Sequence, residues 1–128
     1  MTSSQQIFST VTQHLYDQGH PAHAHNSDCV YNNPDNGDTC AVGCLIPPSL
    51  YNPDMEGKDP KGMVHLLPTG HPTTQMFTDN LHLLGDLQQA HDECPTDSET
   101  GEFLPEALHA ALSKVAITHK LALPGEPA

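Results

Sequence analysis

Cysteines and histidines gather between residues 20 and 44, and their thiolate and imidazole groups are the usual protein ligands of zinc. Cys40 and Cys44 are four residues apart, and a structural zinc site needs a second pair of ligands to complete a tetrahedron. The candidates for that pair precede them: His20, His23, His25 and Cys29. Their spacing matches no known zinc finger, and free cysteines are commonly buried as small apolar residues. We therefore expect a fold that does not depend on zinc, and no metal or other cofactor.

Cys40 could instead act as a nucleophile. Thr39 is placed to cap a short helix that starts at Cys40, and the N-terminus of a helix lowers the pKa of a thiol. His91 and Asp92 would then supply the base and the carboxylate that orients it. Because no family-specific motif of a thiol enzyme accompanies these residues, a Cys-dependent or metal-dependent enzyme is the least favoured function.

A third group of residues suits a small-molecule pocket beside the apolar run 40–46. Tyr31 and Tyr51 could stack on a planar ligand, and Glu56 could accept a hydrogen bond from a base edge or a ribose hydroxyl. The alternative is that both tyrosines are half-buried aromatics with their hydroxyls at the surface. Gly43, between apolar residues, indicates close approach of the backbone, either to a packed neighbour or to a ligand.

We predict that Tyr31, Tyr51, Glu56 and His91 share one cleft that takes a nucleotide-sized ligand, because pockets combine apolar walls with a few convergent polar groups. Met55 and Gly57 belong to the same loop as Glu56, and Asp92 follows His91. The full set of predicted ligand-binding residues is Tyr31, Gly43, Tyr51, Met55, Glu56, Gly57, His91 and Asp92.

The charge balance is strongly acidic, with 16 Asp and Glu against four lysines, no arginine and a formal net charge of −12. Binding to a phosphate backbone gains affinity from Lys and Arg, so this composition disfavours nucleic acid as a partner. An acidic surface can keep a small protein soluble, or it can meet a basic partner protein. The only lysines that could hold a phosphate are Lys58, Lys61, Lys114 and Lys120.

Apolar spacing predicts three main helices. The first begins at a capping box of Ser3 and Gln6, ends at Gly19, and buries Ile7, Phe8, Val11 and Leu15. The second is expected over residues 74–91, where apolar side chains recur every three or four positions. The third begins at Pro105, because proline suits the first turn of a helix.

Turn-forming residues predict a short β-hairpin, in which 29–31 leads into the turn 32–38 and 39–43 returns, unless a helix starts at Cys40. Residues 52–72 are expected to form a long surface loop with a short strand at 63–67. The expected fold class is thus α+β and helix-dominated, with three main helices and a short hairpin in a single small domain. That domain would cover residues 1–128, with a frayed tail over about 121–128.

A pattern of motifs runs through most of the chain: Cys29-x-Tyr31, a Pro-Asp-Gly-like turn, Cys40-Ala-Val-Gly-x-Leu-Ile46, Tyr51, Met55-Glu-Gly57 and Leu87-Gln-x-x-His91-Asp92. This pattern resembles a group of small uncharacterised proteins of tailed phages and bacterial genomes. The resemblance implies a phage or prophage setting and a shared pocket rather than a reaction. Cys44 departs from it, because a small apolar residue such as Ala is expected there, and so does the cluster of His20, His23 and His25.

Three functions follow from these observations. The first is a phage accessory protein that binds and sequesters a nucleotide-like signal of bacterial defence without cleaving it. The second is an acidic inhibitor that docks on a host or defence protein, and the third is the enzyme described above. The chain has neither a signal-peptide pattern at its start nor an apolar run that could span a membrane, so we expect a cytoplasmic protein without a membrane partner. Homo-oligomerisation is left open.

Overall fold

Helices form the frame of the protein in the computed structural model, which describes residues 3–22, 30–33, 37–56 and 58–122. Five are α-helices: α1 (Ser4–Gln18), α2 (Pro60–Met63), α3 (Pro72–Asp79), α4 (Leu81–Glu93) and α5 (Pro105–His119). Three are single 3₁₀ turns: η1 (Gly43–Leu45), η2 (Pro53–Met55) and η3 (Val64–Leu66). Within these ranges no helix has the length and apolar character needed to cross a membrane. Most of the tail expected to fray lies outside the described residues.

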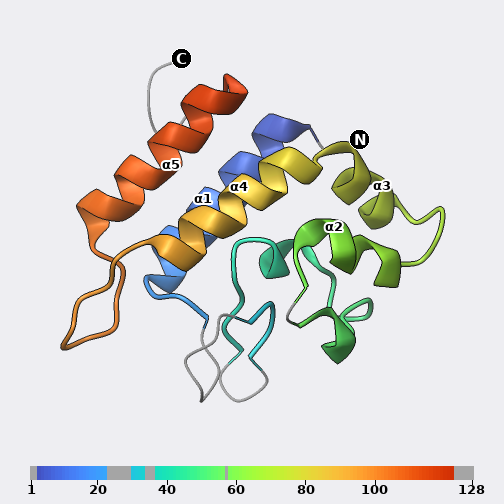
Figure 1. Ribbon diagram of the computed structural model, residues 1–128, viewed down its shortest axis with the longest axis horizontal. Coiled ribbons are helices and arrows are strands. Elements are labelled where there is room, and N and C mark those ends of the chain that lie inside the picture. The colour runs from blue at the N-terminus through green and yellow to red at the C-terminus, as the bar shows by residue number, and fades with distance from the viewer. Residues whose placement is uncertain (1–2, 23–29, 34–36, 57, 123–128) are drawn as a thin grey trace.

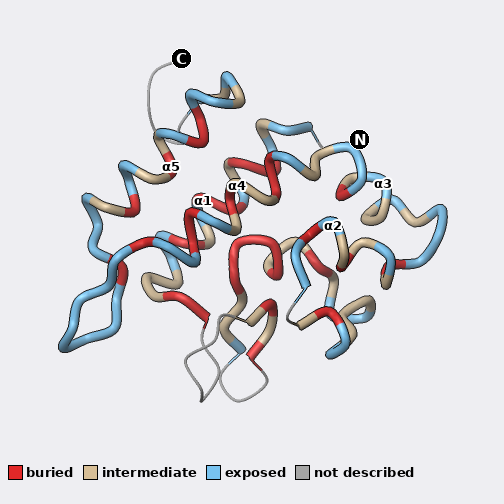
Figure 2. Tube along the Cα trace, viewed as in Figure 1, coloured by how far each residue is buried: buried red, intermediate tan, exposed pale blue. Residues whose placement is uncertain are grey.

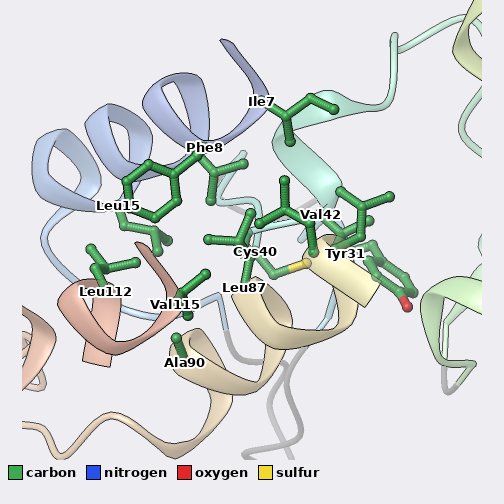
Figure 3. Packing of buried hydrophobic residues seen from close by; sticks show 14 of the residues in the cluster. Ile7, Phe8, Leu15, Tyr31, Cys40, Val42, Leu87, Ala90, Leu112 and Val115 are labelled. Atoms are coloured by element: carbon green, nitrogen blue, oxygen red, sulfur yellow. The ribbon is translucent and has the colours of Figure 1, made fainter. Parts of the chain in front are cut away.

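The long helices α1, α4 and α5 pack together. In Figure 1, α4 and α5 run side by side, α1 lies against α4, and α2 and α3 sit at the end of the molecule where α4 begins. Their buried faces meet the segment 40–42 in one core, where side chains from all four segments point toward one another (Figure 3). The residues labelled there include Phe8, Leu15, Cys40, Val42, Leu87, Ala90, Leu112 and Val115.

The first and third predicted helices are confirmed. Ser3 and Gln6 form the reciprocal capping box at the start of α1, with the Ser3 hydroxyl accepting from the Gln6 N–H at 3.1 Å. Gly19 ends α1 in the left-handed conformation at φ 76°, which glycine adopts without steric cost. Pro105 occupies the first turn of α5, as expected from its fixed φ and missing N–H.

The prediction of one helix over 74–91 is wrong, because the chain forms α3 and α4 with a break at Asn80. Asn80 has φ −129° and ψ 26°, outside the helical region. Its side-chain amide donates to the Met76 carbonyl at 2.8 Å, and its side-chain oxygen accepts from the Ser4 hydroxyl at 2.7 Å. Asparagine side chains compete with backbone partners in this way, which explains why periodic apolar residues did not give a continuous helix.

The expected α+β fold with a hairpin is also wrong: the described residues form a small all-helical domain without a strand. Asn32 and Thr39 make only an isolated antiparallel bridge. The backbone groups of Thr39 bond instead to helix α1. Gln18 accepts from the Thr39 N–H at 3.1 Å and donates to the Thr39 carbonyl at 3.0 Å. Part of the predicted turn, residues 34–36, and Cys29 lie outside the described residues.

Two smaller predictions fail for similar local reasons. The strand expected at 63–67 is replaced by helical turns over 63–66, because Asp59 caps α2 by accepting from the Gly62 N–H at 2.8 Å and Pro60 follows in the first turn. The helix expected to start at Cys40 is a single 3₁₀ turn, η1, that begins at Gly43. Its N-cap residue, Val42, makes no capping hydrogen bond with its side chain, so Thr39 does not cap it.

Gly43 lies directly against the backbone of Tyr31. A Cβ atom built on Gly43 would stand 1.9 Å from the Tyr31 carbonyl oxygen and 2.7 Å from its carbonyl carbon. Both distances are far below van der Waals contact, and the obstacle is backbone rather than the end of a flexible side chain. The glycine is therefore required for packing of the segment 40–46 against Tyr31.

We expect Gly43→Ala to destabilise the protein by about 2–3 kcal/mol, because the new methyl group must push two backbone segments apart. Gly85→Ala is the matched control, since a Cβ at this position of α4 meets nothing within 4 Å. That substitution should raise stability by up to about 1 kcal/mol through better helix propensity. Urea denaturation of the two variants measures both values, and a Gly43→Ala protein as stable as the wild type would contradict the packing argument.

Candidate functional site

Three of the predicted site residues meet around the carboxylate of Glu56. One carboxylate oxygen accepts from the Tyr31 N–H at 2.7 Å, and the other accepts from the Asn32 N–H at 3.2 Å and from the Tyr51 hydroxyl at 2.5 Å. We call Tyr31, Asn32, Tyr51 and Glu56 the Glu56 corner. Hydrogen bonds to an ionised acceptor are stronger than those between neutral groups, so this carboxylate joins two loops firmly.

The polar groups of the Glu56 corner are hydrogen-bonded to one another and to the backbone of Lys58. The Tyr31 hydroxyl donates to the Lys58 carbonyl, and its ring is buried at the edge of the core, with its oxygen pointing away (Figure 3). Burial is the main reason that the pKa of Tyr31 lies above its usual value. The pKa of Tyr51 is raised by burial and then by its hydrogen bond to the Glu56 carboxylate. Both tyrosines are thus neutral donors that stabilise the loops.

The other members of the predicted set that surround this corner have packing contacts. Gly43 meets the Tyr31 backbone, and the Met55 side chain is fully buried in the core, where it offers no surface to a ligand. Gly57 lies outside the described residues. Tyr31, Tyr51 and Glu56 thus lie together as expected from their closeness in sequence. Gly43 packs against the backbone of Tyr31, and Met55 is part of the buried core.

His91 contacts a different group of residues. Its Nε2 accepts the Ala22 N–H at 3.1 Å, and its ring packs edge-on against Phe103 with centroids 5.9 Å apart. Because a backbone N–H can only donate, the ring carries its proton on Nδ1, which donates to the Asp92 carboxylate at 2.7 Å. Both nitrogens of this buried ring are occupied, so His91 has no lone pair to offer as a general base.

Asp92 connects His91 to the apolar segment through one further side chain. Gln88 donates to the Asp92 carboxylate at 2.8 Å, and its own oxygen accepts from the Val42 N–H at 3.1 Å. The negative charge of Asp92 also contributes to the raised pKa of Tyr31. The His91–Asp92 pair is thus linked to the segment 40–46 through Gln88, whereas Tyr31, Tyr51 and Glu56 bond directly to one another.

The described cysteines are not activated. Cys40 is fully buried, and burial raises its pKa well above the ordinary value. Burial likewise raises the pKa of Cys44 to about 12, and it raises the pKa of Cys94. A nucleophilic thiol needs the opposite shift, so the environment of Cys40 gives no support to a thiol enzyme.

Metal ligands do not converge in the part of the chain that the structure describes. No three His, Cys, Asp or Glu side chains come close enough there to hold an ion. Of the histidines in the proposed zinc set, the structure describes His20, whose Nε2 pairs with the Asp38 carboxylate at 2.7 Å. His23, His25 and Cys29, from the proposed zinc set, lie outside the described residues.

Sequence reasoning missed the polar side chains that hold the backbone between α1 and α2. Gln18 and His14 on α1 bond to Thr39, and Gln88 on α4 bonds to Val42. A sequence signal existed for Gln88, because it stands four residues before Asp92 and three before His91 on one helix face. Gln18 carries no comparable signal, since glutamine in a last helical turn is most often solvated.

A groove between α4 and α5 is the concave feature that sequence reasoning did not anticipate. It has a volume of about 440 Å³. Its floor includes Ala90 and Val115, and Glu93 and Lys114 stand on opposite walls. We call it the α4–α5 groove.

Next to this groove, residues 92–106 form an acidic segment that joins α4 to α5. Its six acidic residues are all exposed, and it contains no lysine: Asp92, Glu93, Asp97, Glu99, Glu102 and Glu106. Asp97 shapes the turn by accepting from the Glu99 N–H at 2.8 Å and the Thr100 N–H at 3.1 Å. These two backbone hydrogen bonds lower the pKa of Asp97, so the carboxylate stays charged.

Comparison of the chain with protein-family models, curated proteins and solved structures finds no match in any of the three. The resemblance to phage and bacterial proteins therefore stays a prediction.

We expect Glu56→Gln to destabilise the protein by about 1–3 kcal/mol, because an amide NH₂ cannot accept from the donors that face it. Asp54→Asn is the matched control, since this exposed carboxylate of η2 is close in sequence and the substitution removes the same charge. Thermal unfolding of both variants gives the comparison. Equal melting temperatures for the two variants would show that the Glu56 carboxylate does not hold the loops.

Stability should fall as the pH rises from about 9 to about 11. The folded protein keeps protons on Cys40, Cys44, Tyr31 and Tyr51 because their pKa values are raised, whereas the unfolded chain releases them near their ordinary values. The folded state therefore binds more protons in this window, and alkali favours unfolding. Cys44→Ala removes one such group, so the variant should lose less stability than the wild type in urea titrations across this range. Equal losses would contradict the shift at Cys44.

Proposed function

We propose that this protein is a non-catalytic binding protein that docks its acidic segment on a basic surface of a partner protein. The setting that fits its sequence pattern is a phage or prophage accessory protein that inhibits a host or defence protein in the bacterial cytoplasm. The observation that carries the proposal is the acidic segment, with six exposed carboxylates and no lysine between Asp92 and Glu106.

The shape of the acidic segment supports docking. Figure 1 shows that it projects from the ends of α4 and α5, and Figure 2 shows that most of it is exposed. Two bonds close its base, from the Leu104 N–H to the Pro95 carbonyl at 3.0 Å and from the Asp97 N–H to the Glu102 carbonyl at 2.7 Å. A segment already held in one conformation loses little entropy on binding, and its charges accelerate encounter with a basic surface.

Sequestration of a nucleotide-like signal is the second candidate, favoured by the meeting of Tyr31, Tyr51 and Glu56. It ranks below docking because the polar groups of these residues are bonded to one another. A phosphate would also depend on exposed Lys58 or Lys61, without an arginine anywhere in the chain. Calorimetric titration with cyclic dinucleotides separates the two functions, since saturable binding of a nucleotide would favour sequestration.

We expect capture of the partner from lysate of a bacterial host to weaken as salt rises from about 0.05 M to about 0.5 M, because exposed charges are screened over a few ångströms there. The double variant Glu99→Gln/Glu102→Gln should reduce the captured amount about fivefold at low salt. It leaves the turn intact, because Asp97 is unchanged.

The matched control is Asp54→Asn/Asp79→Asn, which removes the same charge from exposed positions on η2 and α3. This control should retain most of the binding. The docking proposal fails if capture is indifferent to salt, or if both double variants weaken it equally.

A further inference from the structure

The α4–α5 groove combines an apolar floor with charged walls. The buried Ala90 and Val115 form its floor, and Ala111 of α5 also lines it. Asp86 and Glu93 stand on the α4 wall, seven residues or about 10 Å apart along the helix. Lys114 stands on the α5 wall. The groove therefore runs along two turns of α4, with acid on one side and a single base on the other.

The two ends of the groove differ. At one end, the Asp86 carboxylate forms a hydrogen bond with His119 Nε2 at 2.7 Å, which joins the two walls. At the other end, Glu93 belongs to the acidic segment, whose exposed carboxylates continue along the chain after it. A basic occupant would thus be attracted by the carboxylate of Glu93 and the acidic α4 wall. Lys114 on the α5 wall would repel it.

We infer that the α4–α5 groove receives a basic amphipathic helix of the partner protein, with apolar side chains on its floor and Lys or Arg beside Glu93. This inference rests on the proposed docking function and adds the part of the partner that is recognised. A groove between two helices can accept a third helix by ridge-into-groove packing, and helix-in-groove binding uses apolar anchors on one face. A second copy of this chain is a poorer occupant, because a net charge of −12 repels its like.

A defined probe tests this inference. It is a dye-labelled peptide of about 18 residues in which Leu follows helical spacing and Lys fills the other positions, long enough to form a helix on binding. A scrambled peptide of the same composition has equal charge but no apolar face. Fluorescence anisotropy at low salt should show binding of the amphipathic peptide at least about fivefold tighter than binding of the scrambled one, since only the former fills the floor.

Two matched pairs of variants locate the site. Glu93→Lys should weaken binding about three- to tenfold more than Asp79→Lys, which makes the same charge change on α3 away from the groove. Lys114→Glu should strengthen binding about threefold relative to Lys61→Glu on α2, because only the former removes repulsion from the groove wall. Melting temperatures of the four variants check that each one folds.

The outcomes separate this inference from the proposed function. If both members of each pair change affinity equally, or if the scrambled peptide binds as well, the groove inference is overturned while salt-sensitive docking stands. Failure of the amphipathic peptide to bind also overturns the inference. If lysate capture depends on Glu99 and Glu102 but not on Glu93, docking does not use the α4–α5 groove, and the inference is likewise overturned. A dimer in analytical ultracentrifugation that dissociates on Glu93→Lys substitution would assign the groove to a second copy.

Discussion

Every backbone N–H and C=O in a folded chain needs a hydrogen-bond partner, and the segment between α1 and α2 meets this demand with side chains. Gln18 bonds both backbone groups of Thr39, Gln88 accepts from Val42, and Glu56 accepts from two successive residues. His91 does the same for Ala22. Helices α1 and α4 therefore position the segment both through apolar packing and through polar side chains at the margins of the core.

Regular local patterns were predictable from the sequence, and departures from them were not. The capping box at Ser3 and the stop at Gly19 depend on neighbours a few residues away, so α1 could be placed from residue types alone. The break at Asn80 depends on Ser4, which is distant in sequence, and the loss of the hairpin depends on Gln18. A turn-rich segment looks the same in the sequence whether its backbone pairs with a strand or with a side chain.

The candidate site likewise has one part that the sequence predicted and other parts that it did not. The meeting of Tyr31, Tyr51 and Glu56 follows from their closeness in sequence around one apolar run, and it was expected. That their polar groups satisfy one another depends on hydroxyl and carboxylate geometry, which residue types do not reveal. The α4–α5 groove was equally hidden, because it exists only when two helices expected as separate elements come together, with Ala90 and Ala111 among the residues that line it.

The sequence of a segment held by side chains is expected to diverge in evolution differently from the sequence of a strand held in a sheet. Strands pair through backbone groups, so their pairing survives most changes of residue type. One substitution at Gln18 instead removes the side chain that bonds the Thr39 N–H and the His20 carbonyl, and one at Glu56 removes the acceptor of two successive loop amides. Distant relatives of this chain should therefore vary freely over the exposed helix faces while keeping a sparse set of polar positions. That set, together with the glycine opposite Tyr31, is a spaced signature by which such relatives could be recognised when overall identity has faded.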